Sequence, residues 1–257
     1  MAKRCAETWL KVTMNATIKV ITLDLDNTLW CTWPVIARAN ECLHNYISEK
    51  YPAIAKKFPP QTWRPLQDKI MESNPSIRTD FTKIRKKAIE YCAIQCNLND
   101  PQQISEEVFD VFIQSRNTTQ DFLFPGVLTT LESLKKRGFI IGSLSNGNAD
   151  ITQMAHLNPF FSFNIGSAGK PDKAPFQLAF DLAKEHCEGL VSPGQVLHVG
   201  DSLYSDILPA KKFGFHTVWV KTGEDGGTKV VPEEVDFELD EFKEMMNLEI
   251  LSSPMQD

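Results

Sequence analysis

The chain has 257 residues, a net charge of −6 at neutral pH and 42% apolar residues, so it can bury a sizeable core. The acidic balance weighs against nucleic acid as a partner, and no apolar run approaches the roughly 20 residues of a membrane helix. The start lacks the apolar centre of a secretory signal. Six scattered cysteines without metal-binding spacing indicate reduced thiols and a cytoplasmic location, with organelle transit through the first 15 residues as the alternative.

Residues 18–29 combine an apolar, β-branched run with two carboxylates, Asp24 and Asp26, at its end. Such a run is typical of a strand buried on both faces of a parallel sheet. Ligands of open α/β sheets bind just outside the carboxyl ends of the strands, so both side chains could face one metal ion or substrate. On this stretch alone, a solvated acidic loop after a core strand is equally compatible.

Residues 34–118 show apolar positions at helical spacing and no convincing strand. The helical patterns cover 34–50, 62–73, 79–97 and 103–117, with prolines between the first two. We interpret this stretch as an all-α insertion in a chain that begins as α/β.

Strands and helices alternate in the remainder of the chain. The expected strands are 139–145, 163–167, 195–200, 216–220 and 235–239, and the expected helices are 127–137, 149–155, 175–187, 204–213 and 240–248. This alternation predicts a Rossmann-like, doubly wound parallel sheet with right-handed crossovers. The core is therefore expected at 1–31 and 119–257, with a helical cap at 32–118.

Polar groups also follow the second strand. Ser145, Asn146 and Gly147 offer a hydroxyl, an amide and freed backbone N–H groups, which suit a phosphate dianion. Taken alone, they fit an ordinary helix N-cap better.

The third and fourth strands are followed by further charged groups. Lys170 stands in a loop before a helix, where its ammonium could balance several carboxylates, and Lys173 is the competing candidate. Asp201 and Asp206 follow the fourth strand. Hard oxygen ligands select Mg²⁺, lysine and metal together would neutralise a transferring phosphoryl group, and a free carboxylate can form an aspartyl-phosphate.

Four stretches resemble, in order, the four motifs of the haloacid dehalogenase superfamily: Asp24–Thr28, Ser145–Gly147, Lys170–Pro171 and Gly200–Asp206. The helical insertion resembles that superfamily's C1-type cap. Three stretches are similar to bacterial flavin-pathway phosphatases, which act on FMN and 5-amino-6-(5-phosphoribitylamino)uracil: Trp33–Ile36, Ser145–Ala149 and Val196–Asp201.

The resemblance implies roles for matching residues. Asp24 would be the nucleophile and a Mg²⁺ ligand, and Asp26 would act as general acid and then base, with its backbone carbonyl on the metal. The other implied roles are phosphate binding by Ser145, Asn146 and Gly147, a bridge from nucleophile to phosphate by Lys170, metal binding by Asp201, and support of the metal ligands by Asp206.

A carboxyl at Asp26 also favours one reaction class. An alkoxide leaving from a phosphate ester needs a proton, whereas halide does not. We therefore expect a Mg²⁺-dependent phosphomonoester hydrolase acting on a small phosphorylated metabolite, as a monomer or homodimer. Alternatives are a nucleotide or sugar-phosphate phosphatase, a phosphomutase, a 2-haloacid dehalogenase, or a catalytically silent binding protein.

Other conspicuous residues receive structural interpretations. His198 is expected to pack within its strand, and Trp30 and Trp33 to close the seam between core and cap rather than stack on a substrate ring. The basic run at 83–87 indicates a solvated helix face. Arg85 is its one candidate for substrate contact from the cap.

Overall fold

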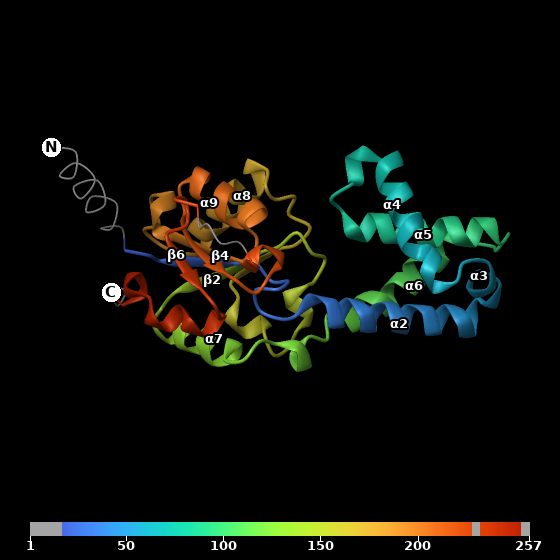
Figure 1. Cartoon of the computed structure of the whole chain (residues 1–257), viewed down its shortest axis with the longest axis horizontal. Coiled ribbons are helices and arrows are strands. Elements are labelled where there is room, and N and C mark those ends of the chain that lie inside the picture. The colour runs from blue at the N-terminus through green and yellow to red at the C-terminus, as the bar shows by residue number, and fades with distance from the viewer. Residues whose placement is uncertain (1–16, 228–231, 253–257) are drawn as a thin grey trace.

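The computed structural model describes residues 17–227 and 232–252. Figure 1 shows an α/β core at one end of the molecule and a bundle of helices at the other. Within the described ranges, no helix has both the length and the apolar character required to cross a bilayer.

The core is a six-stranded parallel sheet with the order β3-β2-β1-β4-β5-β6. Its strands are β1 (Val20–Leu23), β2 (Ile140–Leu144), β3 (Phe163–Ile165), β4 (Val196–Gly200), β5 (His216–Val220) and β6 (Phe237–Leu239). The chain builds outward from β1 on one side and then returns to build from β4 on the other. The predicted doubly wound sheet is confirmed, and its switch point, where ligands bind in such sheets, lies at β1.

Both faces of the sheet are covered by helices. α7 (Val127–Lys136) and a 3-10 helix at Phe242–Asn247 lie on one face, and α8 (Lys173–His186) and α9 (Leu208–Phe213) lie on the other. Ile21 and Leu23 pack into the first of these layers and Val20 into the second. Alternate side chains of β1 therefore enter two separate cores, which explains why three of its four residues are apolar and all four are buried.

Five helices follow β1 and form the bundle at the other end of Figure 1. They are α2 (Thr32–Lys50), α3 (Pro52–Lys57), α4 (Trp63–Ser73), α5 (Phe81–Gln95) and α6 (Pro101–Arg116). The buried residues of their shared core, among them Leu43, Ile89 and Phe112, all come from within this segment. The described structure has no strand between 32 and 118.

Two connecting segments join the bundle to the core, and they are hydrogen-bonded to each other. Cys31 N donates to Phe122 O at 3.1 Å, and Phe124 N donates to Leu29 O at 2.9 Å. This pairing brings the loop after β1 beside the segment that follows α6.

Three predicted helices have a different form. The helix expected near 149–155 is a single 3-10 turn at Ile151–Gln153, because Asp150 accepts from the Thr152 N–H and its own N–H donates to Asn117. Such side-chain bonds compete with helical ones. The segment expected as a helix at 204–213 begins with a π-helical turn at Leu203–Ile207 before α9, and that at 240–248 is 3-10.

Candidate active site

Asp24 lies directly after β1, at the switch point of the sheet. Its N–H donates to Val199 O at 2.8 Å, which extends the pairing with β4 by one residue. Lys170 Nζ lies 2.8 Å from Asp24 Oδ1 and 2.7 Å from Leu144 O, and it also pairs with Asp206. Both Asp24 and Lys170 are buried.

Lys173, the competing candidate, lies elsewhere. It is exposed at the start of α8, with its ammonium 5.9 Å from the centre of the Phe213 ring. Lys170 is thus the lysine that reaches Asp24.

Three carboxylates converge beside this lysine. Oxygens of Asp24, Asp201 and Asp206 lie within 4.8 Å of one another. Burial raises the pKa of Asp24 to about 7, and burial followed by repulsion from Asp24 raises the pKa of Asp201 to about 8. Burial works to raise the pKa of Asp206 as well, but the charge of Lys170 and the hydrogen bonds to His198 and Lys170 together outweigh burial and lower that pKa to about 2.

These carboxylates fit a divalent cation. Lys170 pairs with Asp24 and Asp206, so one positive charge faces the three acids when all are ionised. Burial is the main cause of the raised pKa values of Asp24 and Asp201, and repulsion among the three acids adds to it. Carboxylate oxygens in such a cluster are the donors that hard divalent cations take.

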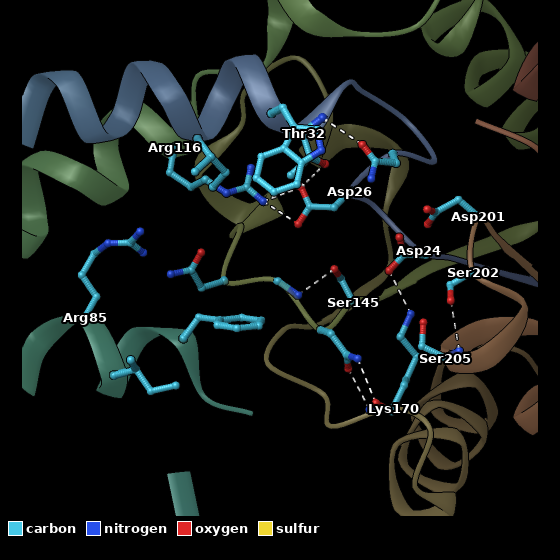
Figure 2. A pocket seen from close by; sticks show the side chains of 18 of the residues that line it. Asp24, Asp26, Thr32, Arg85, Arg116, Ser145, Lys170, Asp201, Ser202 and Ser205 are labelled. Atoms are coloured by element: carbon cyan, nitrogen blue, oxygen red, sulfur yellow. Dashed lines mark hydrogen bonds and ion pairs between the residues drawn. The ribbon is translucent and has the colours of Figure 1, made fainter. Parts of the chain in front are cut away.

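Asp26 points away from this cluster and contacts the helical bundle. Arg116 Nη2, at the end of α6, lies 2.6 Å and 2.7 Å from the two Asp26 oxygens. Trp30 Nε1 and the Thr32 hydroxyl donate to Oδ1 at 2.9 Å and 3.0 Å. Figure 2 shows the Arg116 side chain reaching Asp26 from the helix.

Sequence reasoning missed Arg116. It stands 90 positions from Asp26, and a cation in the last turn of a helix already has an ordinary explanation in the helix dipole. The side chain is 1% exposed, and its Nε and Nη1 have no hydrogen-bond partner.

The loop after β2 is tied to the lysine loop. Asn146 Oδ1 accepts from Lys170 N at 2.7 Å, and Asn146 Nδ2 donates to Lys170 O at 2.9 Å. Gly147 N donates to the buried Ser145 hydroxyl at 3.1 Å. A Cβ at Gly147 would lie 2.2 Å from Asp26 Oδ2, so only glycine allows Asp26 its position.

His198 supports the site from inside the sheet, as expected for a packed strand residue. Its Nδ1 lies 2.9 Å from the Thr22 hydroxyl and its Nε2 lies 3.4 Å from Asp206 Oδ1. Mainly through burial, the pKa of His198 is lowered, so the ring is neutral at pH 7.

A cavity of about 390 Å³ lies between the core and the helical bundle. All residues predicted for catalysis, phosphate binding, metal binding and substrate contact line it: Asp24, Asp26, Arg85, Ser145, Asn146, Gly147, Lys170, Asp201 and Asp206. In Figure 2 the acids and Lys170 lie on the core side and Arg85 faces them from α5.

The two tryptophans separate. Trp30 is fully buried, as a seam residue should be, but Trp33 is 64% exposed and lines the cavity. The expectation that Trp33 closes the seam is therefore wrong. Trp33 lies in the first turn of α2, and this turn directs Val35 rather than Trp33 into the core.

Residues 18–214 match the model of the haloacid dehalogenase-like hydrolases. The chain belongs to this family of hydrolases. The order of the four motifs along the chain and the convergence of their side chains on one cavity agree with that membership.

Curated relatives of this hydrolase include phosphatases. The chain is 27% identical over 205 residues to 5-amino-6-(5-phospho-D-ribitylamino)uracil phosphatase YigB of Escherichia coli, covering 79% of this chain and 84% of the relative. It is 30% identical over 243 residues to glyceraldehyde 3-phosphate phosphatase of Pyrococcus furiosus, covering 91% and 90%.

A solved structure is similar over nearly the whole hydrolase. The 2-haloacid dehalogenase from Pseudomonas syringae superposes with a TM-score of 0.77 at 29% identity, covering 90% of this chain and 97% of that one. Proteins named as phosphatases and one named as a dehalogenase are thus similar to this chain to about the same degree. The residues of the site must therefore distinguish the two reactions.

Proposed function

We propose that the chain is a Mg²⁺-dependent phosphatase that hydrolyses small phosphomonoesters through a phosphorylated Asp24. The observation that carries this proposal is a pair of carboxyl groups that line one cavity. Asp24 forms an ion pair with Lys170, and Asp26 follows two residues later. The first can attack phosphorus, and the second can supply the proton that a leaving alkoxide needs. The names of the YigB and Pyrococcus relatives point to the same reaction class.

Asp24, Asp201 and Asp206 supply the carboxylates that would hold Mg²⁺, with the backbone carbonyl of Asp26 as the further ligand that the family resemblance implies. When bound, the metal neutralises negative charge on the phosphoryl group and on these acids.

The side chains then divide the chemistry. An Asp24 oxygen attacks phosphorus, the ester bond breaks, and the leaving alkoxide takes a proton from Asp26. Asp26 next removes a proton from the water that attacks the phosphorus of the aspartyl-phosphate and frees Asp24. Lys170 holds Asp24 in place at 2.8 Å and offsets phosphoryl charge. The Ser145 hydroxyl and the second N–H of the Asn146 amide offer donors to the phosphoryl oxygens, and Gly147 N, which donates to the Ser145 hydroxyl, keeps that hydroxyl in place.

We further propose that residues 32–118 act as a cap on a core formed by 1–31 and 119–257. The cavity lies between these parts, so closure of the cap would exclude water from the phosphoryl step. FMN and 5-amino-6-(5-phosphoribitylamino)uracil are the substrates that the flavin-pathway resemblance suggests.

A 2-haloacid dehalogenase is the second candidate, because the Pseudomonas syringae enzyme is similar over 90% of the chain. In that reaction Asp24 would attack carbon and release halide, and Asp26 would have no leaving group to protonate.

Hydrolysis of p-nitrophenyl phosphate with Mg²⁺ tests the proposal. We expect turnover that excess EDTA abolishes and that Asp24→Asn lowers by at least about 1,000-fold, because an amide is a poor nucleophile. Asp110→Asn, an exposed acid of α6, is the matched control and should retain full activity. If the chain released halide from 2-chloropropionate but no phosphate from p-nitrophenyl phosphate, it would instead be a dehalogenase. If it hydrolysed neither 2-chloropropionate nor any phosphate ester, a silent binding protein would be favoured.

A further inference from the structure

One cation that lines the cavity lacks a carboxylate. Lys170 pairs with Asp24 and Asp206. Arg116 pairs with Asp26, and Arg64 pairs with Asp68. No carboxylate of the described residues lies within ion-pair distance of Arg85.

Arg85 is nevertheless fixed in place. Its guanidinium carbon lies 3.6 Å from the centre of the Phe112 ring, and Nη2 makes a single long hydrogen bond of 3.3 Å to Asn40 Oδ1. A guanidinium has five N–H donors. Stacking on Phe112 orients this donor-rich group but satisfies none of its N–H bonds.

A second guanidinium lies close to the first. Figure 2 shows Arg85 on α5 pointing toward Arg116 on the neighbouring helix. Burial, followed by repulsion from Arg116, lowers the pKa of Arg85 to about 10. Arg116 donates to Asp26 through Nη2, while its Nε and Nη1 are buried without an acceptor. Among the described residues, Asp26 therefore pairs with Arg116 alone, and the neighbouring Arg85 has no anion of its own, so an added anion would stabilise the two guanidiniums.

We propose that Arg85 and Arg116 form a subsite for a second anionic group of the substrate, a carboxylate or a second phosphate at the far end of the leaving group. Arg85 makes the contact, and Arg116 adds its charge and holds Asp26. This inference rests on the proposed phosphatase function. It names the substrate class as short phosphomonoesters that carry another negative charge.

Two aromatic rings in the lining of the cavity suit a carbon skeleton. Trp33 from α2 and Phe81 from α5 are both exposed and both line the cavity. In this proposal the phosphate lies at Asp24, the second anion lies at Arg85, and the carbon skeleton of the leaving group packs against these rings. FMN and the pyrimidine intermediate carry no charge beyond the phosphate, so the subsite ranks them below doubly anionic esters.

Matched substrate pairs test the subsite by activity. 3-Phosphoglycerate and glycerol 3-phosphate differ only by a carboxylate in place of a hydroxymethyl group, and fructose 1,6-bisphosphate and fructose 6-phosphate differ by a second phosphate. We expect kcat/KM to be at least about tenfold higher for the doubly anionic member of one pair, and the pair that responds identifies the anion. Arg85→Gln should bring that ratio close to one, Arg85→Lys should preserve part of it, and Lys87→Gln, an exposed cation of the same helix, should leave it unchanged.

Binding gives a readout that does not require turnover. In the Asp24→Asn chain with Mg²⁺, calorimetric titration of the same pairs should show tighter binding of the anionic member, and adding Arg85→Gln should remove the difference. Suppose that the wild type hydrolyses p-nitrophenyl phosphate but that the kcat/KM ratio is near one for both substrate pairs, or that a ratio above one is unchanged in Arg85→Gln. The subsite is then refuted and the phosphatase stands. If no ester is hydrolysed, the phosphatase fails, and the titrations alone decide the subsite.

Discussion

Arg116, the last residue of α6, places one nitrogen within 2.7 Å of both carboxylate oxygens of Asp26. The contact joins the end of the helical bundle to the proposed proton donor of the core. Asp26 also accepts from Thr32, the first residue of α2. The carboxylate is therefore held by both ends of the bundle.

Arg116→Leu should impair both stability and turnover. Removing one partner of a buried pair costs about 3–5 kcal/mol when both are buried, and Asp26 is partly exposed, so we expect a loss of about 2–3 kcal/mol. Urea denaturation measures this loss. We also expect kcat for p-nitrophenyl phosphate to fall by about 10- to 100-fold, because Asp26 loses its fixed orientation.

Arg116→Lys separates charge from geometry in the same residue. It keeps the cation and loses the planar fork, so it should recover more stability than turnover. A leucine variant with wild-type kcat would show that Arg116 does not position Asp26.

Gly147→Ala should displace Asp26. The new Cβ would lie 2.2 Å from Oδ2, so the carboxylate must move by about 1 Å, a shift that can lower a rate by about 100-fold. Gly227→Ala is the control, since a Cβ at that exposed glycine meets no atom within 4 Å. Steady-state kinetics of the two variants make the comparison, and equal rates would contradict the assigned role of Gly147.

Lys170→Met and Lys173→Met should differ sharply. The first leaves two buried carboxylates without their cation, so we expect a loss of about 3–5 kcal/mol in unfolding free energy and of at least about 100-fold in kcat. The second removes an exposed charge from α8 and should change neither quantity. Substantial activity in Lys170→Met would mean that the bridge to Asp24 is dispensable.

Stability without metal should fall as pH rises from about 4 to 8. The unfolded pKa of Asp24 and Asp201 is 3.8, and the folded values are raised to about 7 and about 8. Across this range the folded chain holds protons that the unfolded chain has released, so raising the pH favours unfolding. Asp206 acts in the opposite direction, but its lowered pKa matters only near pH 2 to 4.

Metal addition tests the same acids. Mg²⁺ binds ionised carboxylates, so the rise in Tm on replacing EDTA with Mg²⁺ should be larger near pH 8.5 than near pH 5.5. Asp201→Asn should shrink this difference between the two pH values. A rise in Tm that is the same at both pH values would argue against a metal at these acids.

The sequence predicted the parts of the site that local patterns determine. The largely apolar, β-branched run before Asp24 indicates a doubly buried strand whatever follows it, and β1 is such a strand in the interior of the sheet. Lys170 and Lys173 are only three positions apart, so the sequence alone did not decide which of them reaches Asp24. The hydrogen bonds from Asn146 to the backbone of Lys170 help to fix the path of the chain there.

Long-range contacts, and which of two nearby side chains is buried, could not be predicted from the sequence. Arg116 meets Asp26 through the packing of α6 against α2, which no neighbouring residue of either one reveals. Trp30 and Trp33 are three positions apart across the start of a helix, where one turn decides which ring enters the core. Near residue 150, the Asp150 side chain replaced helical hydrogen bonds that the apolar spacing had suggested.

The hydrogen bonds between the two connecting segments restrict how the bundle can move. Leu29 and Cys31 are paired with Phe124 and Phe122, so neither connector can slide past the other without breaking this pairing. A paired ribbon bends most easily out of its own plane. Rotation of the proposed cap about these paired connectors would change the wall of the cavity that the bundle supplies and would leave Asp24 where β1 has placed it.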